Sequence, residues 1–123
     1  MNSNSLHIAI QGVEGSFHEE ACQLFFKNEE INFVYCDTFE QVFQRTQKHD
    51  TLGFIAIENS LAGRVADIHY LLPKYKLQIH GEHFQGVQHN LISKPNAELK
   101  DIKFVRSHAQ AIGQCQNLIT KKK

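Results

Sequence analysis

Residues 53–63 read GFIAIENSLAG, an apolar run of strand type that stops at a carboxylate, an amide and a hydroxyl. These three polar groups belong to Glu58, Asn59 and Ser60, and they stand where a buried strand would leave its sheet. In open α/β sheets the carboxyl ends of the strands are where ligands bind. Packing alone gives little reason to place the three together, so the stretch predicts a binding site for a polar small molecule.

The hydrophobic pattern on either side of this stretch alternates between strand and helix. The expected strands are residues 6–10, 31–36 and 52–57, and the expected helices begin at Ser16, at Asp37 and near Val65. The almost continuous apolar run 52–57 is typical of a central parallel strand covered on both faces. The order β-α-β-α-β-α predicts a parallel sheet with helical crossovers.

Each expected helix has an apolar face at helical spacing. Ser16 with Glu19, and Asp37 with Glu40, have the arrangement expected at a helix start, and the first pair has the spacing of a capping box. Pro73 is expected to close the third helix. The expected inner faces are Phe17, Ala21, Leu24 and Phe25, then Phe39, Val42, Phe43 and Thr46, then Val65, Ile68 and Leu72.

The remainder of the chain changes character after Tyr75. Residues 75–93 are polar and lack a helical period, which predicts an extended segment crossing between two lobes, and residues 94–96 are an expected turn. A strand over 102–106 and a helix from Ser107, with Ile112, Cys115 and Ile119 inward, should follow. Such a second lobe cannot close a core, so we expect a first lobe at 6–75 and an incomplete second lobe at 76–123.

The composition limits the possible classes of function. The 123 residues are 41% hydrophobic, enough for a core, and 13 Lys plus Arg balance 13 Asp plus Glu. This neutral balance disfavours nucleic-acid and membrane-surface partners. Three cysteines without a Cys-x-x-Cys pair fit a reducing compartment. With no bilayer-spanning apolar stretch and no signal peptide at the polar start, the expected location is cytoplasmic.

Three segments, in order along the chain, carry a resemblance to a known family. They are GVEGSFHE at 12–19, IENSLAG at 57–63 and SHAQAIGQC at 107–115. Together they resemble the N-terminal glycine turn, the Glu-Asn-Ser loop and the Ser-His-x-Gln-Ala segment of prephenate dehydratases. The resemblance runs from about Leu6 to Leu118.

The resemblance implies an α/β fold of two lobes like those of type II periplasmic binding proteins. It also implies the dehydration and decarboxylation of prephenate to phenylpyruvate, in phenylalanine biosynthesis, without a metal or organic cofactor. The family's Thr-Arg-Phe motif, whose threonine is thought to act at the leaving hydroxyl, has no counterpart, because no threonine here precedes an arginine. We therefore expect a fragment with negligible turnover, from a homodimeric parent whose phenylalanine-sensing domain lies elsewhere.

The residues that the resemblance assigns to the substrate lie at strand ends and helix starts, where backbone N–H groups attract carboxylates. We expect them to converge on one cleft between the lobes. They are Gly15, Ser16, Glu58, Asn59, Ser60, Gly63, Ser107, His108 and Gln110.

Each assignment has a structural alternative. Ser16 with Glu19, and Ser107 with Gln110, also fit helix capping, which is compatible with binding. For Glu58, a structural role as a carboxylate that accepts backbone N–H groups explains the residue as well as contact with the substrate does. His80 and His83 lie three apart on an extended segment and should face opposite sides, which disfavours a shared metal. Gly12 and Gly15 lack the full dinucleotide-binding pattern.

Two rival functions stay open. An arogenate dehydratase would act on the amino analogue of prephenate and cannot be separated by these residues. A non-catalytic ligand-binding or sensor module on the same fold would keep the cleft and lose Thr-Arg-Phe, which is the expectation if the chain is complete. The coding sequence beyond Lys123 would separate the sensor from the enzyme.

Overall fold

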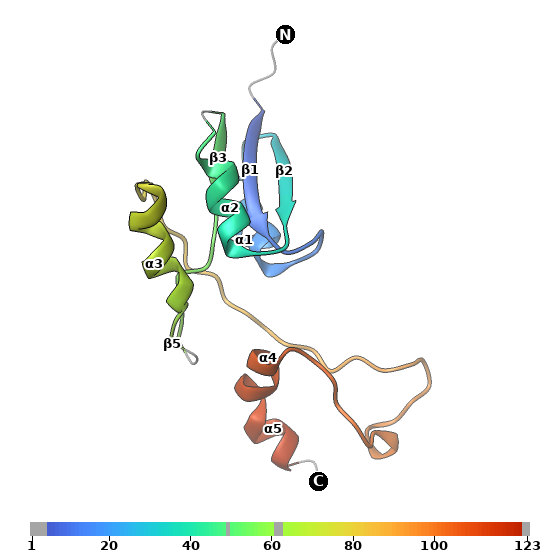
Figure 1. The fold of residues 1–123 in the computed structure, drawn as a ribbon. Coiled ribbons are helices and arrows are strands. Elements are labelled where there is room, and N and C mark those ends of the chain that lie inside the picture. The colour runs from blue at the N-terminus through green and yellow to red at the C-terminus, as the bar shows by residue number, and fades with distance from the viewer. Residues whose placement is uncertain (1–4, 49, 61–62, 122–123) are drawn as a thin grey trace. The chain divides into compact units, whose positions relative to one another are not determined.

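The structure is a computed structural model that describes residues 5–48, 50–60 and 63–121. The chain divides into two compact units (Figure 1), the first of residues 1–59 and 63–85 and the second of residues 60–62 and 86–123. Each unit is described by itself. Among the described residues, no helix combines the length and the apolar character that crossing a bilayer requires.

The first unit is built on a three-stranded parallel sheet, as the β-α-β-α-β pattern predicts. Its strands are β1 (Leu6–Gln11), β2 (Ile31–Cys36) and β3 (Thr51–Gly53), in the order β2-β1-β3. Leu6 pairs with Ile31 on one side of β1, and His7 pairs with Thr51 on the other. The mixed α/β class with a parallel sheet is therefore confirmed.

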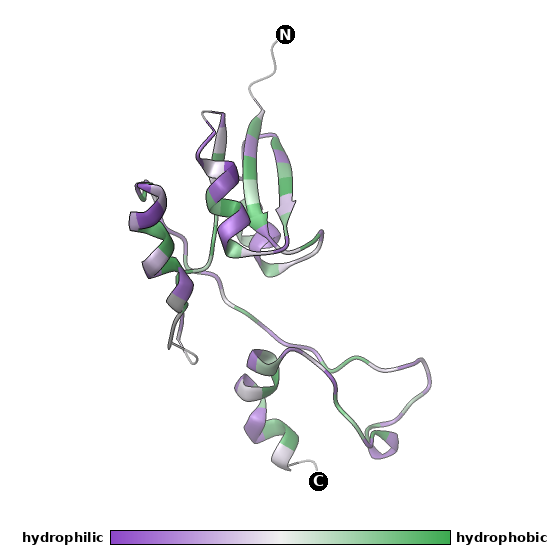
Figure 2. Ribbon diagram, in the orientation of Figure 1, coloured by the Kyte–Doolittle hydropathy of each residue, from purple (hydrophilic) through white to green (hydrophobic). Residues whose placement is uncertain are grey.

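The central strand of the sheet is β1. The prediction that the run 52–57 forms the central strand was therefore wrong. Ile8, Ala9 and Ile10 of β1 are 0% exposed, whereas Leu52 of β3 is 47% exposed. The run is apolar for another reason: Phe54, Ile55 and Ile57 lie beyond the end of β3 and pack against the helices. Continuous hydrophobicity thus reflects helix packing after the strand has left the sheet. Figure 2 shows the apolar colouring along β1.

Helices α1 (Phe17–Phe25) and α2 (Phe39–Thr46) cover opposite faces of the sheet. Ile8 and Ile10 pack with Cys22 of α1, while Ala9, which points to the other face, packs with Val42 of α2. This alternation follows from the two-residue period of a strand.

The expected inner face of α1 was only partly right. Ala21 is buried, but Phe17, Leu24 and Phe25 are 44%, 52% and 40% exposed. The stripe that meets the sheet runs instead through Glu19, Cys22 and Phe26, at the i, i+3, i+7 spacing of one helix face.

The start of α2 lies one residue later than expected. Thr38, not Asp37, is the N-cap: its hydroxyl accepts from the Gln41 N–H at 3.1 Å, and the Gln41 side chain accepts from the Thr38 N–H at 3.3 Å. This reciprocal arrangement is a capping box, which Asp37 and Glu40 do not form. The expected inner face of α2 is confirmed in its centre, because Val42 and Phe43 are buried.

Helix α3 (Ala66–Tyr75) packs on α2 through Ile68, Leu71 and Phe43. Pro73 lies inside the helix and does not close it, contrary to expectation. The helix ends at Lys76, whose φ of 55° is left-handed. The turn after Pro73 is held because Glu40 of α2 accepts from the Lys74 ammonium and the Tyr75 hydroxyl, each at 2.7 Å.

The second unit contains the 3-10 helix η1 (Leu99–Asp101) and helices α4 (Ala109–Gln114) and α5 (Gln116–Lys121). Residues 77–93 form neither helix nor strand, as the missing helical period predicts, and their crossing between two lobes stays a prediction. The turn at 94–96 is confirmed by the Ala97 N–H, which donates to the Lys94 carbonyl at 3.2 Å. The expected strand 102–106 is absent from this described segment, and Phe104 is 89% exposed. A strand needs a neighbour for its backbone groups, and no strand is found in the described part of this unit.

The single helix expected from Ser107 is two short helices separated at Cys115. The N–H of Cys115 bonds the carbonyls of Ala111 and Ile112 at 3.1 and 3.2 Å, which tightens the turn and ends α4. Ile112, Cys115 and Ile119, the expected inward face, are half-buried.

Candidate functional site

The polar loop follows a segment that is anchored step by step to the sheet and to α1. The Phe54 N–H donates to the Ala9 carbonyl of β1 at 3.0 Å, and the Ala56 N–H donates to Nε2 of His18 at 3.1 Å. The segment then forms a small hairpin of β4 (Glu58–Asn59) and β5 (Gly63–Arg64). Because β3 ends at Gly53, the polar residues do not directly follow a strand of the sheet as expected, and they lie instead in the hairpin that comes after residues 54–57.

Within this loop the side chains of Glu58 and Ser60 are exposed and that of Asn59 is half-buried. Glu58 pairs with Arg64, and Asn59 with Gly63, across the antiparallel hairpin. The backbone therefore brings Gly63 opposite Asn59, as a short hairpin requires. The exposed carboxylate of Glu58 and hydroxyl of Ser60 therefore face solvent at this loop.

The turn before α1 depends on the conformational freedom of its two glycines. Gly12 and Gly15 have φ of 125° and 87°, values that L side chains rarely adopt. The Ser16 hydroxyl accepts from the Glu19 N–H at 3.3 Å, so the predicted cap is confirmed. The Glu19 carboxylate accepts from the Gly15 N–H at 3.0 Å rather than from Ser16, one residue earlier than in a standard box.

Glu19 also connects this turn to β2. Its second carboxylate oxygen accepts the hydroxyl hydrogen of Tyr35, and its side chain is 9% exposed. The Tyr35 hydrogen bond, followed by the Gly15 N–H, lowers the pKa of Glu19. The same bond, with burial and the negative charge, raises the pKa of Tyr35 to about 12. Near neutral pH the pair is therefore a carboxylate and a neutral phenol.

His18 lies between the two helix starts and the end of β3. Its ring meets the ring of Phe39, the first residue of α2, edge-on with centroids 6.1 Å apart. Burial lowers the pKa of His18, which favours the neutral imidazole. A neutral ring has one unprotonated nitrogen, and here Nε2 is the acceptor for Ala56.

In the first unit the 15–16 turn follows β1, and the segment that leads to the Glu58–Asn59 hairpin follows β3. These strands are parallel, so their carboxyl ends lie at one edge of the sheet. The Gly12 N–H bonds the Cys36 carbonyl at 2.9 Å, which joins the ends of β1 and β2, and the His18 bond joins α1 to the chain after β3.

Ser107, His108 and Gln110 belong to the second unit, as does Ser60. The expected capping pair of Ser107 with Gln110 is wrong: His108 is the N-cap of α4, and its Nδ1 accepts from the Gln110 N–H at 3.1 Å. The imidazole nitrogen thus takes the capping role that the hydroxyl of a serine has at many helix starts. Nearby, His89 and Gln114 are joined by a hydrogen bond of 2.7 Å.

His18 and Tyr35 were not among the predicted site residues. His18 lies 38 residues from its partner, and the pairing depends on how β3 is placed against β1. The sequence signal was limited to a polar ring in the first turn of a helix after two glycines. Tyr35 alternates with apolar neighbours in a strand, a pattern that indicates only an outward side chain.

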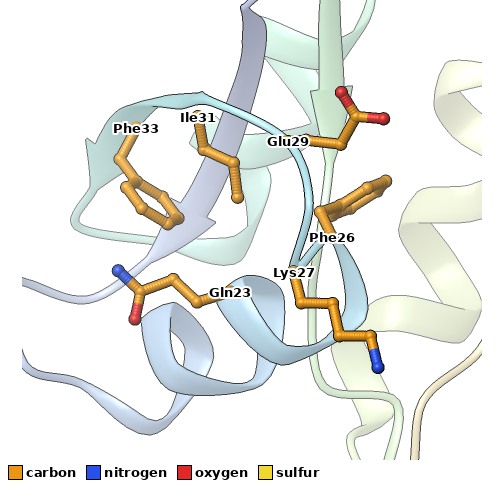
Figure 3. Close-up of a pocket in the computed structure, with 6 residues that line it drawn as sticks. All are labelled: Gln23, Phe26, Lys27, Glu29, Ile31 and Phe33. Carbon is orange, nitrogen blue, oxygen red and sulfur yellow. The ribbon is translucent and has the colours of Figure 1, made fainter.

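Two surface hollows lie outside the predicted site. One of about 200 Å³ lies between the end of α1 and the start of β2, with Lys27 and Glu29 extending outward (Figure 3). Its lining residues are Gln23, Phe26, Lys27, Glu29, Ile31 and Phe33. The other, of about 290 Å³, is lined by Tyr35, Cys36, Gln41, Gln44 and Arg45. The described residues contain no group of three or more His, Cys, Asp or Glu that could hold a metal ion.

A parallel sheet with helices on both faces places the first unit in the class of mixed α/β proteins. The sequence matches the prephenate dehydratase family over residues 8–123. The chain therefore belongs to the prephenate dehydratase family.

The relatives agree with this family. The "Bifunctional N-acyl-homoserine lactone acylase/prephenate dehydratase" of Komagataeibacter europaeus is 40% identical over 92% of this chain and 40% of that protein. The "Prephenate dehydratase" of Methanocaldococcus jannaschii is 35% identical over 88% of this chain and 39% of that protein. "Arogenate dehydratase/prephenate dehydratase 2, chloroplastic" of Arabidopsis thaliana is 33% identical over 98% of this chain and 31% of that protein.

A solved structure supports the fold. The protein GqqA, described as a novel type of quorum quenching acylase, superposes with a TM-score of 0.73 at 38% identity, over 94% of this chain and 42% of that chain. This chain thus spans between 31% and 42% of the length of the proteins compared here.

Proposed function

We propose that the protein to which this chain belongs is a prephenate dehydratase, a lyase that converts prephenate to phenylpyruvate, water and carbon dioxide. The observation that carries the proposal is the family match over residues 8–123, which spans both units and all three motifs. The relative from Methanocaldococcus jannaschii that bears this name is 35% identical.

The chemistry suits the groups at the edge of the first sheet. Prephenate carries two carboxylates and a ring hydroxyl that leaves as water while carbon dioxide departs. Aromatisation supplies the driving force, so the site has to hold the anions, orient the ring and protonate the leaving oxygen. This reaction needs no electron sink, and the donors required are amide, hydroxyl and backbone N–H groups.

We propose that Asn59 and Ser60 donate to a substrate carboxylate and that Glu58 lies beside the bound ring. The turn at Gly15 and Ser16 gives the backbone its shape, since the Gly15 N–H is already bonded to Glu19. The proposed set remains Gly15, Ser16, Glu58, Asn59, Ser60, Gly63, Ser107, His108 and Gln110. The threonine thought to act at the leaving hydroxyl belongs to the Thr-Arg-Phe motif, which this sequence does not contain.

For the fold, we propose that the first unit is a lobe of the type II periplasmic-binding-protein kind. Its support is the parallel sheet in the order β2-β1-β3 with helices on both faces. Substrate would then bind at the carboxyl edge of the strands.

Arogenate and an N-acyl-homoserine lactone are alternative substrates, because relatives are named for acting on them. The Arabidopsis thaliana relative is named an arogenate dehydratase as well, and the 40% identical relative is also named an N-acyl-homoserine lactone acylase. Arogenate differs from prephenate by an amino group in place of the keto oxygen, so the same anion donors would serve both.

The test measures phenylpyruvate formed from prephenate by the 123-residue chain and by the product of the complete open reading frame that encodes it. Parallel reactions contain arogenate or an N-acyl-homoserine lactone. We expect prephenate turnover by the complete product and negligible turnover by the 123-residue chain. Turnover of only the lactone, or of none of the three, would refute the proposal.

A further inference from the structure

The bond between Ala56 and His18 occupies the place of a missing strand partner. Alternate N–H groups along a strand point to the same neighbour. After Phe54, which donates to Ala9 of β1, the next donor on that side is therefore Ala56. On β1 the acceptor that continues this parallel register would be the carbonyl of Gln11, the last residue of the strand before the chain turns at Gly12. The Ala56 N–H is accepted instead by Nε2 of His18 at 3.1 Å.

The His18 ring is held in place from two sides. It belongs to the first turn of α1, which the Ser16 cap fixes to the glycine turn, and its ring meets Phe39 of α2 edge-on. The ring is half-buried, and burial lowers its pKa, which favours the neutral form. The hydrogen bond from the Ala56 N–H assigns the unprotonated nitrogen of that form to Nε2. His18 is thus an oriented acceptor and not a mobile surface group.

The anchored residue lies two positions before Glu58. One position after Ala56, the Ile57 carbonyl accepts from the Val65 N–H at 2.9 Å, which closes the base of the hairpin. The polar loop is therefore fixed at its entry by His18 and at its base by Val65. Loss of the His18 acceptor would release the backbone at Ala56 but would leave the bond between Val65 and Ile57 in place.

We infer that His18 is a positioning residue for substrate binding, because its Nε2 sets the backbone from which Glu58, Asn59 and Ser60 present their polar groups. This role rests on the proposed function. His18 does not itself contact the substrate, and its effect passes through the backbone of residues 56–58.

A set of three variants in the complete gene product tests this role. His18→Leu removes the acceptor, His18→Gln places an amide oxygen where Nε2 lies, and His7→Leu makes the same change at an exposed histidine of β1. We expect His18→Leu to raise KM for prephenate about fivefold, the factor for losing one hydrogen bond, with kcat less affected. His18→Gln and His7→Leu should remain within about twofold of the wild type.

The same variants in the 123-residue chain give a structural signature by NMR. In the wild type, Nε2 of His18 should have the nitrogen shift of an unprotonated acceptor, correlated with the Ala56 amide. His18→Leu should move the amide signals of Ala56, Ile57 and Glu58, and His18→Gln should largely restore them. A protonated Nε2, or Glu58 signals that His18→Leu leaves unmoved, would overturn the inference.

The kinetic outcomes separate this inference from the proposed function. If the wild type makes phenylpyruvate and His18→Leu has the same KM, the positioning role is refuted and the proposed function stands. If the wild type makes none, the proposed function is refuted, and with it the role in prephenate binding, even where the NMR signature shows the bond. Damage by His18→Gln equal to that by His18→Leu would also refute the acceptor role.

Discussion

The carboxylate of Glu19 accepts the hydroxyl hydrogen of Tyr35, and its other oxygen accepts the Gly15 N–H. One side chain thus fastens the glycine turn before α1 to the second strand of the sheet. Both donors favour the ionised carboxylate, so the pKa of Glu19 in the folded chain lies below its usual value of 4.5.

The first prediction concerns the pH dependence that this pair creates. A depressed pKa in the folded state contributes stability above the unfolded pKa, and that stability is lost as the pH falls through the folded pKa. The free energy of unfolding should therefore decrease below about pH 4.5, and less steeply in Glu19→Gln than in the wild type. Urea unfolding at pH 7 and at pH 3 measures the difference.

Glu30→Gln serves as the control, because Glu30 is an exposed carboxylate outside this arrangement. It should change the pH slope little. If Glu19→Gln and Glu30→Gln had equal slopes, the linkage of Glu19 to folding would be wrong.

A second prediction tests which strand is central. Ile10→Ala removes a side chain that is 0% exposed and should lower the free energy of unfolding by about 3 kcal/mol. Leu52→Ala, in a strand with one neighbour and a side chain 47% exposed, should cost about 1 kcal/mol or less. Equal losses by denaturant titration would contradict the order β2-β1-β3.

The cysteines provide a third prediction. Burial, and then the charge of Glu19, raises the pKa of Cys22 to about 12, and burial likewise raises the pKa of Cys36. A thiolate is the reactive form, so both should resist an alkylating reagent at pH 7.5 in the folded chain. Half-buried Cys115 should be modified first, as judged by peptide mass spectrometry, and urea should expose the other two. Early modification of Cys22 would show that α1 is not packed on the sheet as described.

The fourth prediction concerns His108. Its Nδ1 caps α4, so we expect a role in binding or structure and not in proton transfer. The pH profile of kcat in the complete gene product should be unchanged by His108→Gln, and His108→Asn, which keeps a capping oxygen, should preserve the helix start. A lost limb of the profile in both variants would assign His108 to acid–base catalysis.

The sequence was most informative where a local rule governs the structure. Strand 31–36 and the Ser16 cap follow from β-propensity and capping, which need no distant partner. The polar residues at 58–60 were singled out by the abrupt change from apolar to polar residues, but the strand expected to end there, β3, ends at Gly53.

The errors share a different cause, since each depends on tertiary contacts. The run 52–57 is apolar because its later residues pack into the clusters between the sheet and the helices. The helix that contains Pro73 continues to Tyr75, where Lys74 and Tyr75 donate to Glu40 of α2. The strand expected at 102–106 lacks a partner strand among the described residues of its unit. His18 was missed because an acceptor for Ala56 is visible only once the sheet is assembled.

The most direct test of the proposed site is kcat/KM for prephenate in Asn59→Ala of the complete gene product. We predict a loss of about tenfold or more, because a buried substrate anion would lose a donor. The matched control is Asn32→Ala, whose exposed amide bonds Ser5 near the amino end of β2 and should leave kcat/KM unchanged. An Asn59→Ala enzyme as efficient as the wild type would contradict the assignment of this loop to the substrate.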